Sequence, residues 1–168
     1  MKNYKNLITV AIDSPAAAGA GTQAKLIAKE YNLFYLDTGK IYRYIGLLKL
    51  NHPKKFNYKI IQNKIKKLKM KELSKKNLLS DKVAISASII AKDKKIRKIV
   101  HVFQKKCAYF PPKKYSGSVL DGRDIITVQL KDAMFKFFIT ASLKIRAERR
   151  YKEYKSLNKI IKYKKEKL

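Results

Sequence analysis

Residues 7–43 decide the fold, and they read LITVAIDSPAAAGAGTQAKLIAKEYNLFYLDTGKIYR. The apolar, β-branched run Leu7–Asp13 predicts a strand, and a loop of small residues with two glycines follows it. An amphipathic helix is predicted over 22–31, and Phe34–Asp37 predicts a second short strand. Backbone N–H groups and the helix dipole converge where a glycine loop meets a helix N-terminus. This unit therefore predicts a site for an anionic group.

The spacing of the loop is that of a phosphate-binding P-loop, G-x-x-x-x-G-K-[ST], with two replacements. Gly19 occupies the second glycine position, but Ser14 stands at the first glycine and Ala20 stands at the lysine. Thr22 opens the helix. The sequence thus predicts the shape of a phosphate loop without its usual positive charge. Lys25, one turn or more further along the same helix, is a candidate for the missing cation.

Two further apolar runs, Ser118–Asp121 and Phe135–Thr140, also predict strands that end at or near an acidic or hydroxyl residue. Helical patterns separate or follow the four runs, at about 39–50, 81–91, 94–107 and 142–153. Buried runs that alternate with helices favour a parallel sheet of the βαβ type. Ligands of such sheets bind beyond the carboxyl ends of the strands. We expect that edge to carry Asp13, Asp37, Asp121 and Thr140.

The segment 51–79 is lysine-rich, and the sequence leaves its structure open. His52 and Pro53 end the preceding helix, because proline cannot continue it. The stretch KIIQNKIKKLKMKEL that follows fits either an exposed helix or a short strand pair. Its periodicity does not decide between the two.

Length and composition bound the class of protein. At 168 residues, with 46% hydrophobic residues, the chain fits one domain with a sizeable core. Its single cysteine, Cys107, excludes an internal disulfide framework and is typical of a reducing cytoplasm. The N-terminal apolar run is too short for a signal peptide, and no stretch approaches the roughly 20 apolar residues of a membrane span. We therefore expect a soluble, cytoplasmic protein.

The formal net charge of +29 has two interpretations. Clustered Lys and Arg would indicate a nucleic-acid or membrane-surface protein, because they release counterions from phosphate polymers. Here the lysines are scattered through almost every segment, and no RNA-binding signature accompanies them. A lysine-biased composition is the simpler explanation, and we expect neither a nucleic-acid nor a membrane partner. The positive field still attracts small anionic substrates.

Ser118–Thr127, which reads SVLDGRDIIT, is the second informative segment. The predicted strand ends at Asp121, Gly122 allows a tight turn, and Arg123 and Asp124 project from that turn. Arginine offers a planar fork for a phosphate, and a nearby carboxylate either holds that arginine or binds an amino group. By itself the segment fits either a binding site or a surface Arg–Asp pair.

Together the motifs resemble the cytidylate kinase (CMP kinase) family of P-loop nucleoside-monophosphate kinases in content, order and spacing. They are the P-loop, LDTG-x-x-YR at 36–43, SDKVAISASIIAKDKKIRK at 80–98, DGRDI at 121–125 and FITAS-x-x-x-RAERR at 138–150. The resemblance covers nearly the whole chain. It implies a P-loop NTPase-like three-layer α/β fold, with a central parallel sheet of about four strands and a helical nucleoside-monophosphate-binding region. It also implies transfer of the γ-phosphoryl group of ATP to CMP or dCMP.

On the ATP side, the resemblance implies that the loop and one later arginine bind the phosphates. These residues are Ser14, Pro15, Ala16, Ala17, Ala18, Gly19, Ala20, Gly21, Thr22 and Arg149. The hydroxyl of Thr22 is the expected protein ligand of Mg²⁺, which is the expected cofactor with ATP as co-substrate. Asp37 and Asp121 are candidates for ordering Mg²⁺ through water, or for capping a turn or helix.

On the acceptor side, the resemblance implies a set of polar side chains drawn from three motifs. They are Thr38, Tyr42, Arg43, Ser88, Arg97, Arg123 and Asp124. Arg43 and Arg123 match the arginines that hold the CMP phosphate, and together with Asp124 they are the expected catalytic residues. Ser88, Arg97 and Asp124 match residues that read cytosine, whose amino group donates and whose N3 and O2 accept. The expected partners are ATP, CMP and dCMP, and the chain is expected to be a monomer.

Two further departures from the family pattern concern a turn and the chain's end. Ile126 stands where the family has glycine, and the sequence ends at Leu168, before the family's lid arginines, ribose-binding carboxylate, last strand and last helix. We expect one P-loop kinase domain over 1–168, with the monophosphate-binding region at about 51–110 and a truncated lid from about 142 to 168. An alternative is a catalytically weakened or inactive nucleotide- or RNA-binding protein on a kinase scaffold. It is suggested by Ala20 at the lysine position, by the end of the sequence at Leu168 and by the net charge of +29.

Overall fold

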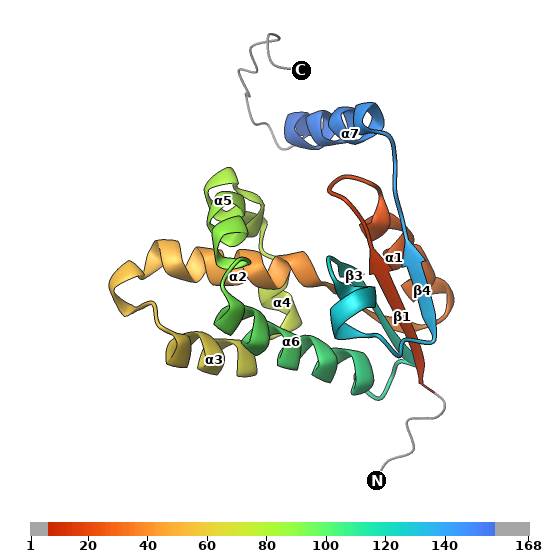
Figure 1. The fold of residues 1–168 in the computed structure, drawn as a ribbon, viewed down its shortest axis with the longest axis horizontal. Coiled ribbons are helices and arrows are strands. Elements are labelled where there is room, and N and C mark those ends of the chain that lie inside the picture. Colours follow the sequence, from red (N-terminus) through yellow and green to blue (C-terminus); the bar gives the residue numbers. More distant parts are fainter. Residues whose placement is uncertain (1–6, 157–168) are drawn as a thin grey trace.

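A sheet of four parallel strands forms the centre of the computed structural model, which describes residues 7–156 (Figure 1). The strands are β1 (Ile8–Asp13), β2 (Leu33–Asp37), β3 (Gly117–Gly122) and β4 (Phe135–Phe138), in the order β2-β3-β1-β4. β1 pairs with β3 in register from Ile8 opposite Gly117 to Asp13 opposite Gly122. The predicted α/β fold with a parallel sheet of about four strands is therefore confirmed.

The five longer helices lie close to their predicted bounds. They are α1 (Ala20–Glu30), α2 (Thr38–Asn51), α5 (Asp81–Ile90), α6 (Lys94–Tyr109) and α7 (Leu143–Ser156). Side-chain caps fix two of their starts. Asp37 accepts a hydrogen bond from the backbone nitrogen of Lys40, and Asp93 accepts bonds from the first turn of α6. The rest of the predicted lid, 157–168, lies outside the described residues.

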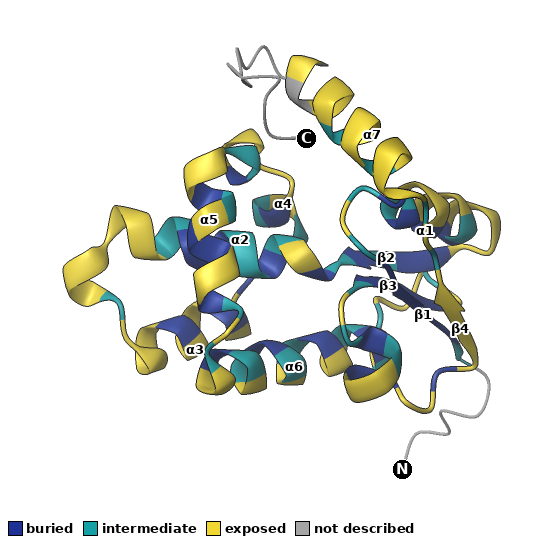
Figure 2. Cartoon of the chain, turned by 45° about the horizontal axis from the view of Figure 1, so that its top comes forward, coloured by how far each residue is buried: buried dark blue, intermediate teal, exposed yellow. Residues whose placement is uncertain are grey.

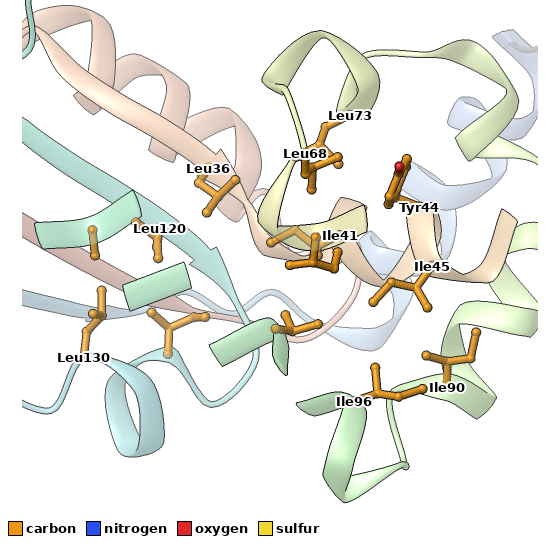
Figure 3. Close-up of a cluster of buried hydrophobic side chains, with 14 of the residues drawn as sticks. Leu36, Ile41, Tyr44, Ile45, Leu68, Leu73, Ile90, Ile96, Leu120 and Leu130 are labelled. Atoms are coloured by element: carbon orange, nitrogen blue, oxygen red, sulfur yellow. The ribbon is translucent and has the colours of Figure 1, made fainter. Parts of the chain in front are cut away.

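Two hydrophobic clusters cover the two faces of the sheet. On one face Ala24 and Ala28 of α1 pack with Val10, Ile12 and Val119. Figure 2 shows α1 beside the buried strands of the sheet. Small alanine side chains let this helix lie close to the strands. On the other face the sheet contributes Ala11, Leu36 and Leu120, and the helices contribute Ile41, Ile45, Ile90 and Ile96 (Figure 3). The helical layer therefore shares one continuous core with the sheet.

The segment 51–79 is helical, so the strand-pair alternative is wrong. It contains η2 (Pro53–Lys55), α3 (Tyr58–Lys66), α4 (Met70–Leu73) and η3 (Lys76–Leu79). α2 ends at Asn51, as the His52–Pro53 break predicts. The segment is also only partly exposed, because five of its apolar residues are buried while its lysines, Tyr58 and Ile60 are exposed. The buried residues are Ile61, Ile65, Leu68, Leu73 and Leu78.

α5 packs directly on α2 at Gly46. A Cβ at Gly46 would lie 3.0 Å from the backbone nitrogen of Ala87 and 3.1 Å from the carbonyl oxygen of Val83. The hydroxyl of Ser86 also donates a hydrogen bond to the carbonyl oxygen of Gly46, at 3.2 Å. The two helices therefore meet backbone to backbone, and this contact fixes the position of α5 relative to the sheet.

β4 differs from the other strands because all four of its residues are exposed. Its sequence predicts a buried run as far as Thr140, but the strand ends at Phe138 and Phe138 is 70% exposed. The prediction of burial is wrong because β4 lies at an edge of the described sheet, with β1 on one side only, and no residue of β4 belongs to either hydrophobic cluster. β2 lies at the other edge but is covered, because Leu33, Phe34 and Leu36 pack in the clusters. None of the described helices has the length and apolar content that crossing a membrane requires.

Candidate active site

The loop between β1 and α1 bends through two residues in the left-handed backbone region, Ala17 (φ 59°) and Gly19 (φ 98°). The carbonyl oxygen of Gly19 accepts hydrogen bonds from the backbone nitrogens of Thr22 and Gln23, at 3.1 and 3.2 Å. No side chain caps α1, and its first turn holds no acidic residue. The first N–H groups and the positive end of the helix dipole are thus left for an external anion.

Arg149 of α7 lies against this loop, although it comes from the other end of the described chain (Figure 1). Its Nη1 donates a hydrogen bond to the carbonyl oxygen of Ala18, at 2.8 Å. A Cβ at Gly19 would lie 3.1 Å from the same nitrogen, so glycine also permits the close approach. A guanidinium has five N–H donors, of which this bond uses one. The structure therefore brings a cation to the loop that lacks a lysine.

Ala20 and Lys25 occupy different surroundings. Ala20 is buried in the cluster beneath α1, together with Val10 and Ile12. Lys25 is exposed, and its positive charge only partly opposes the rise that burial, and then Asp37, give the pKa of Asp121, so Lys25 lies near the end of β3. Thr22, the predicted metal ligand, is exposed in the first turn of α1. Counted from Ser14, the hydroxyl position of the P-loop pattern falls on Gly21, and Thr22 is the next residue.

Asp37 and Asp121 are register partners at the carboxyl ends of β2 and β3. Asp121 is only 9% exposed, and its pKa is raised to about 7, first by burial and then by the negative charge of Asp37. The hydroxyl of Tyr35 forms a hydrogen bond with Asp121. Among the described residues, Oδ1 of Asp121 has no hydrogen-bond partner. An unpartnered oxygen beside a second carboxylate favours a bound cation.

The carboxylate pair fits Mg²⁺, which prefers one or two protein oxygens and completes its shell with water and substrate phosphates. Within residues 7–156 no group of three or more His, Cys, Asp or Glu side chains forms a metal cage. The acidic pair beside the phosphate loop agrees with a metal that arrives together with a nucleotide.

Asp13, predicted to lie at the ligand edge, is there, but its carboxylate is used inside the protein. Oδ1 accepts a hydrogen bond from the backbone nitrogen of Ile125 at 2.7 Å, and Oδ2 accepts one from Ile126 at 3.2 Å. The backbone nitrogen of Ser14 donates to the carbonyl oxygen of Gly122, at 3.2 Å. The phosphate loop and the turn after β3 are thus joined by three hydrogen bonds.

An open pocket of about 460 Å³ lies beside the phosphate loop, at the carboxyl ends of β2 and β3. α2, α5, α6 and the turn after β3 all contribute to its lining. The lining includes six residues predicted for the acceptor side, Thr38, Tyr42, Arg43, Ser88, Arg97 and Arg123. The seventh, Asp124, is not part of the lining. Residues from three separate sequence motifs therefore meet in one pocket.

Internal contacts hold two of the pocket residues in place. The hydroxyl of Thr38 donates a hydrogen bond to the carbonyl oxygen of Asp121, at 2.8 Å. Gly122 is required beside it, because a Cβ there would overlap Oγ1 of Thr38. Nη1 of Arg43 donates to the carbonyl oxygen of Leu78 at 2.9 Å, so the segment 51–79 supports this arginine.

Arg97 and Asp124 form an ion pair at the far side of the pocket, with Nη2 and Oδ2 2.6 Å apart. Asp124 has a left-handed backbone (φ 56°). Tyr42 lies near both charges, and burial raises its pKa while the charge of Arg97 opposes that shift. Ser88 is exposed, and its hydroxyl donates to the carbonyl oxygen of Ile85 at 2.7 Å. The carboxylate of Asp124 thus holds Arg97.

Two residues of the site are absent from the sequence predictions. Tyr35 lies two residues before Asp37, and the period-2 alternation of a strand puts both on one face, so the sequence contained a signal for it. Gln129 lines the pocket from the end of η4 (Ile125–Gln129), a π-helical turn. No sequence pattern announces that turn, so its inward direction could not be foreseen.

A phosphate loop after the β1 strand of a parallel sheet, beside an arginine-lined pocket, defines a P-loop nucleotide-binding protein. The family model described as Cytidylate kinase matches residues 10–167. The cytidylate kinase of Clostridium tetani is 39% identical over 173 residues, which cover 94% of this chain and 72% of that protein. The cytidylate kinase of Paramagnetospirillum magneticum is 41% identical to this chain over 145 residues, which cover 86% of this chain and 68% of that protein. The cytidylate kinase of Rhodospirillum rubrum is 36% identical over 148 residues, which cover 88% of this chain and 70% of that protein. The chain belongs to the cytidylate kinase family.

Proposed function

We propose that the chain transfers the γ-phosphoryl group of ATP to CMP or dCMP, giving ADP and CDP or dCDP. The observation that carries this proposal is the continuity of loop and pocket. Ser14 belongs to the phosphate loop and also lines the arginine-rich pocket. A donor phosphate on the loop and an acceptor phosphate in the pocket would therefore be neighbours at one edge of the sheet.

The ATP phosphates bind to the backbone of residues 14–22 and to Arg149. The first turn of α1 has no acidic residue and no side-chain cap among the described residues, which supports the first contact because no described side chain competes with the phosphates for the first N–H groups. The hydrogen bond from Arg149 to Ala18 supports the second, because it anchors the guanidinium beside the loop. In this proposal Arg149 supplies positive charge that Ala20 does not.

The acceptor phosphate binds to Arg43 and Arg123, with Thr38 at the same end of the pocket. One of its oxygens attacks the γ-phosphorus, and the bond from that phosphorus to the β,γ-bridging oxygen breaks, so ADP leaves. The attacking oxygen is already anionic, so no general base is needed. The arginines position the phosphates and neutralise charge, which is the main contribution of protein in phosphoryl transfer.

The base of the acceptor binds between Ser88, Arg97 and Tyr42. The ion pair at 2.6 Å supports a reading role for Arg97, because Asp124 fixes the guanidinium that would donate to N3 and O2 of cytosine. Asp124 acts in this arrangement through Arg97. The base contacts then select the acceptor, while the phosphate contacts are common to all monophosphates.

Thr22, Asp37 and Asp121 are the proposed residues for Mg²⁺. The unpartnered oxygen of buried Asp121 supports this role. When bound, Mg²⁺ supplies positive charge to the transferring phosphates. We further propose that the chain acts as a cytoplasmic monomer with one kinase domain, in which about 51–110 binds the monophosphate and a lid begins near 142. A non-catalytic RNA-binding role is not favoured, because the family match spans the whole site.

The test is an ADP-release assay on the whole chain with CMP, dCMP, UMP, AMP and GMP as acceptors. CMP and dCMP should be strongly preferred, and Arg123→Ala should lower the rate with each of them. Lys113→Ala, at an exposed position away from the pocket, is the control and should leave the rate unchanged. Equal turnover of all acceptors, or CMP-independent ADP release alone, would contradict the proposal.

A further inference from the structure

A second pocket lies in the helical layer and is lined by the end of α2, the turn around η2, and α3. Its volume is about 450 Å³, and it shares no lining residue with the pocket beside the phosphate loop. Figure 1 shows the end of α2 and α3 at the side of the molecule away from the sheet. None of the residues proposed for ATP, Mg²⁺ or the acceptor lines this pocket, so the kinase reaction does not account for it.

The floor of this second pocket is apolar. Ile61 belongs to the main hydrophobic cluster, and Leu48 and Phe56 pack against that cluster. Ile60 is the most exposed of the four apolar lining residues, at 37%. The apolar surface is therefore recessed and small. Pockets of a few hundred Å³ with such a lining are typical of small-molecule sites, whereas protein partners need a much broader face.

The polar side chains around the floor are basic or neutral. They are His52, Lys55, Asn63, Lys64 and Lys67, and all five are exposed. Within residues 7–156, none of the three lysines forms an ion pair with a carboxylate. The sequence also contains no Asp or Glu between Asp37 and Glu72. An anion at the mouth of the pocket would thus meet positive charge from three residues and no opposing negative charge in the lining.

Two carboxylates that contact the same segment are used elsewhere. Asp93 accepts a hydrogen bond from the hydroxyl of Tyr58 at 2.9 Å, and it also caps α6. Glu72 accepts a bond from the backbone nitrogen of Lys69, at 2.9 Å. Neither carboxylate lines the pocket. The charge of the rim therefore remains available to a ligand.

We propose that this pocket binds a small anionic amphiphile, with its hydrocarbon group on the apolar floor and its carboxylate or phosphate head at Lys55, Lys64 and Lys67. Burial of the hydrocarbon group supplies affinity in proportion to its area, and the ammonium groups attract the head. Both parts of the ligand are needed. A small inorganic anion would leave the floor exposed to water, and a neutral hydrocarbon would leave the lysines without an anion.

The experiment is calorimetric titration of the whole chain with decanoate, decyl phosphate and acetate, at about 150 mM salt to screen weak surface attraction. Decanoate, decyl phosphate or both should bind about tenfold or more tightly than acetate, which lacks the hydrocarbon group. The tighter of the two amphiphiles identifies the head group.

Three variants then locate the site. Lys64→Ala/Lys67→Ala should weaken the tighter amphiphile by about tenfold or more. Lys59→Ala/Lys66→Ala is the matched control, because it removes the same charge from the same segment at exposed positions outside the lining. Its affinity should stay within about twofold of wild type. Ile60→Gln should weaken the amphiphile by about fivefold or more, because it replaces part of the apolar wall.

Equal weakening by the two lysine pairs would show that the general positive field attracts the anion, and it would overturn the proposal. Acetate binding as tightly as decanoate, or unchanged affinity in Ile60→Gln, would overturn it as well. If neither amphiphile binds but an amphipathic peptide of Glu and Leu does, the surface is a protein-docking site and the proposal fails. These titrations measure binding alone, so their outcome does not depend on the proposed kinase function.

Discussion

Nη1 of Arg149 lies 2.8 Å from the carbonyl oxygen of Ala18, although 131 residues separate the two in the chain. The contact joins α7 to a phosphate loop whose lysine position is Ala20. Loop geometry and positive charge, which a usual P-loop supplies from one short segment, come here from two distant segments.

Arg149→Ala should therefore weaken ATP binding and slow phosphoryl transfer. Loss of a hydrogen bond to a charged group costs about 1.5–3 kcal/mol, which corresponds to roughly tenfold or more in kcat/KM for ATP. Arg150→Ala is the matched control, because Arg150 pairs with Glu153 on the same helix. The measurement is ATP titration at saturating CMP.

The double variant Ala20→Lys/Arg149→Ala tests whether the two positions share one role. A lysine at 20 should lower the stability of the fold, because Ala20 is buried beside Val10 and Ile12. In the folded protein it should restore part of the activity of Arg149→Ala and raise the activity of the otherwise wild-type chain much less. If the lysine has the same effect in both backgrounds, the two positions act independently and Arg149 does not replace the missing charge.

Arg97 and Arg123 should affect acceptor choice in different ways. Arg97→Ala should reduce CMP use by about 1.5–3 kcal/mol, or roughly tenfold or more, and should reduce the preference for CMP over other monophosphates. Arg123→Ala should weaken every monophosphate alike, because a phosphate contact carries no base identity. A panel of acceptors measured at fixed ATP separates the two outcomes, and an unchanged preference in Arg97→Ala would place base reading elsewhere.

The stability of the fold should fall in mild acid, in part because of His101. Burial, and then the positive charge of Arg97, hold the pKa of His101 below its ordinary value of 6.5. The unfolded chain therefore binds a proton near pH 6.5 while the folded chain does not, so the free energy of unfolding decreases as pH falls below about 6.5.

Urea unfolding of His101→Gln at pH 7.5 and pH 5.5 should show a smaller loss than wild type. His52→Gln is the control, because His52 is the other histidine of the chain and is exposed. Equal losses in all three proteins would show that His101 does not contribute to the acid sensitivity.

Gly122→Ala should disturb the junction between β3 and α2. The added Cβ would overlap Oγ1 of Thr38, so the hydrogen bond from that hydroxyl to Asp121 must break or the turn must shift. We expect a loss of about 1–3 kcal/mol in the free energy of unfolding and a higher KM for CMP than for wild type. The double variant Gly122→Ala/Thr38→Ala should relieve the overlap and recover part of the lost stability. If the double variant is no more stable than Gly122→Ala, the strain does not come from the contact with Thr38.

The sequence was sufficient for the parts of the fold that depend on local patterns. β1, the loop and α1 follow from an apolar run, small residues and an amphipathic period. Asp13, Asp37 and Asp121 reach the same edge because the strands are parallel and in register. The grouping of Arg43, Arg97 and Arg123 in one site was implied by the resemblance to the cytidylate kinase family, and all three arginines line one pocket.

Features set by long-range packing were not predictable. The exposure of β4 depends on which edge strand the helices cover, and an apolar run such as FKFF does not contain that information. The burial of Ile61 and Ile65 within a lysine-rich stretch depends on the helices that cover them. The direction of Gln129 depends on a π-helical turn that Asp13 stabilises from another strand.

Asp13 is the last residue before the phosphate loop. Its carboxylate also accepts hydrogen bonds from the backbone of Ile125 and Ile126, in the turn between Arg123 and Gln129. Any movement of the loop on binding the donor is thus passed to the turn that binds the acceptor. The two nucleotides should bind cooperatively, and by reciprocity CMP should change the affinity for ATP by the same factor as ATP changes the affinity for CMP.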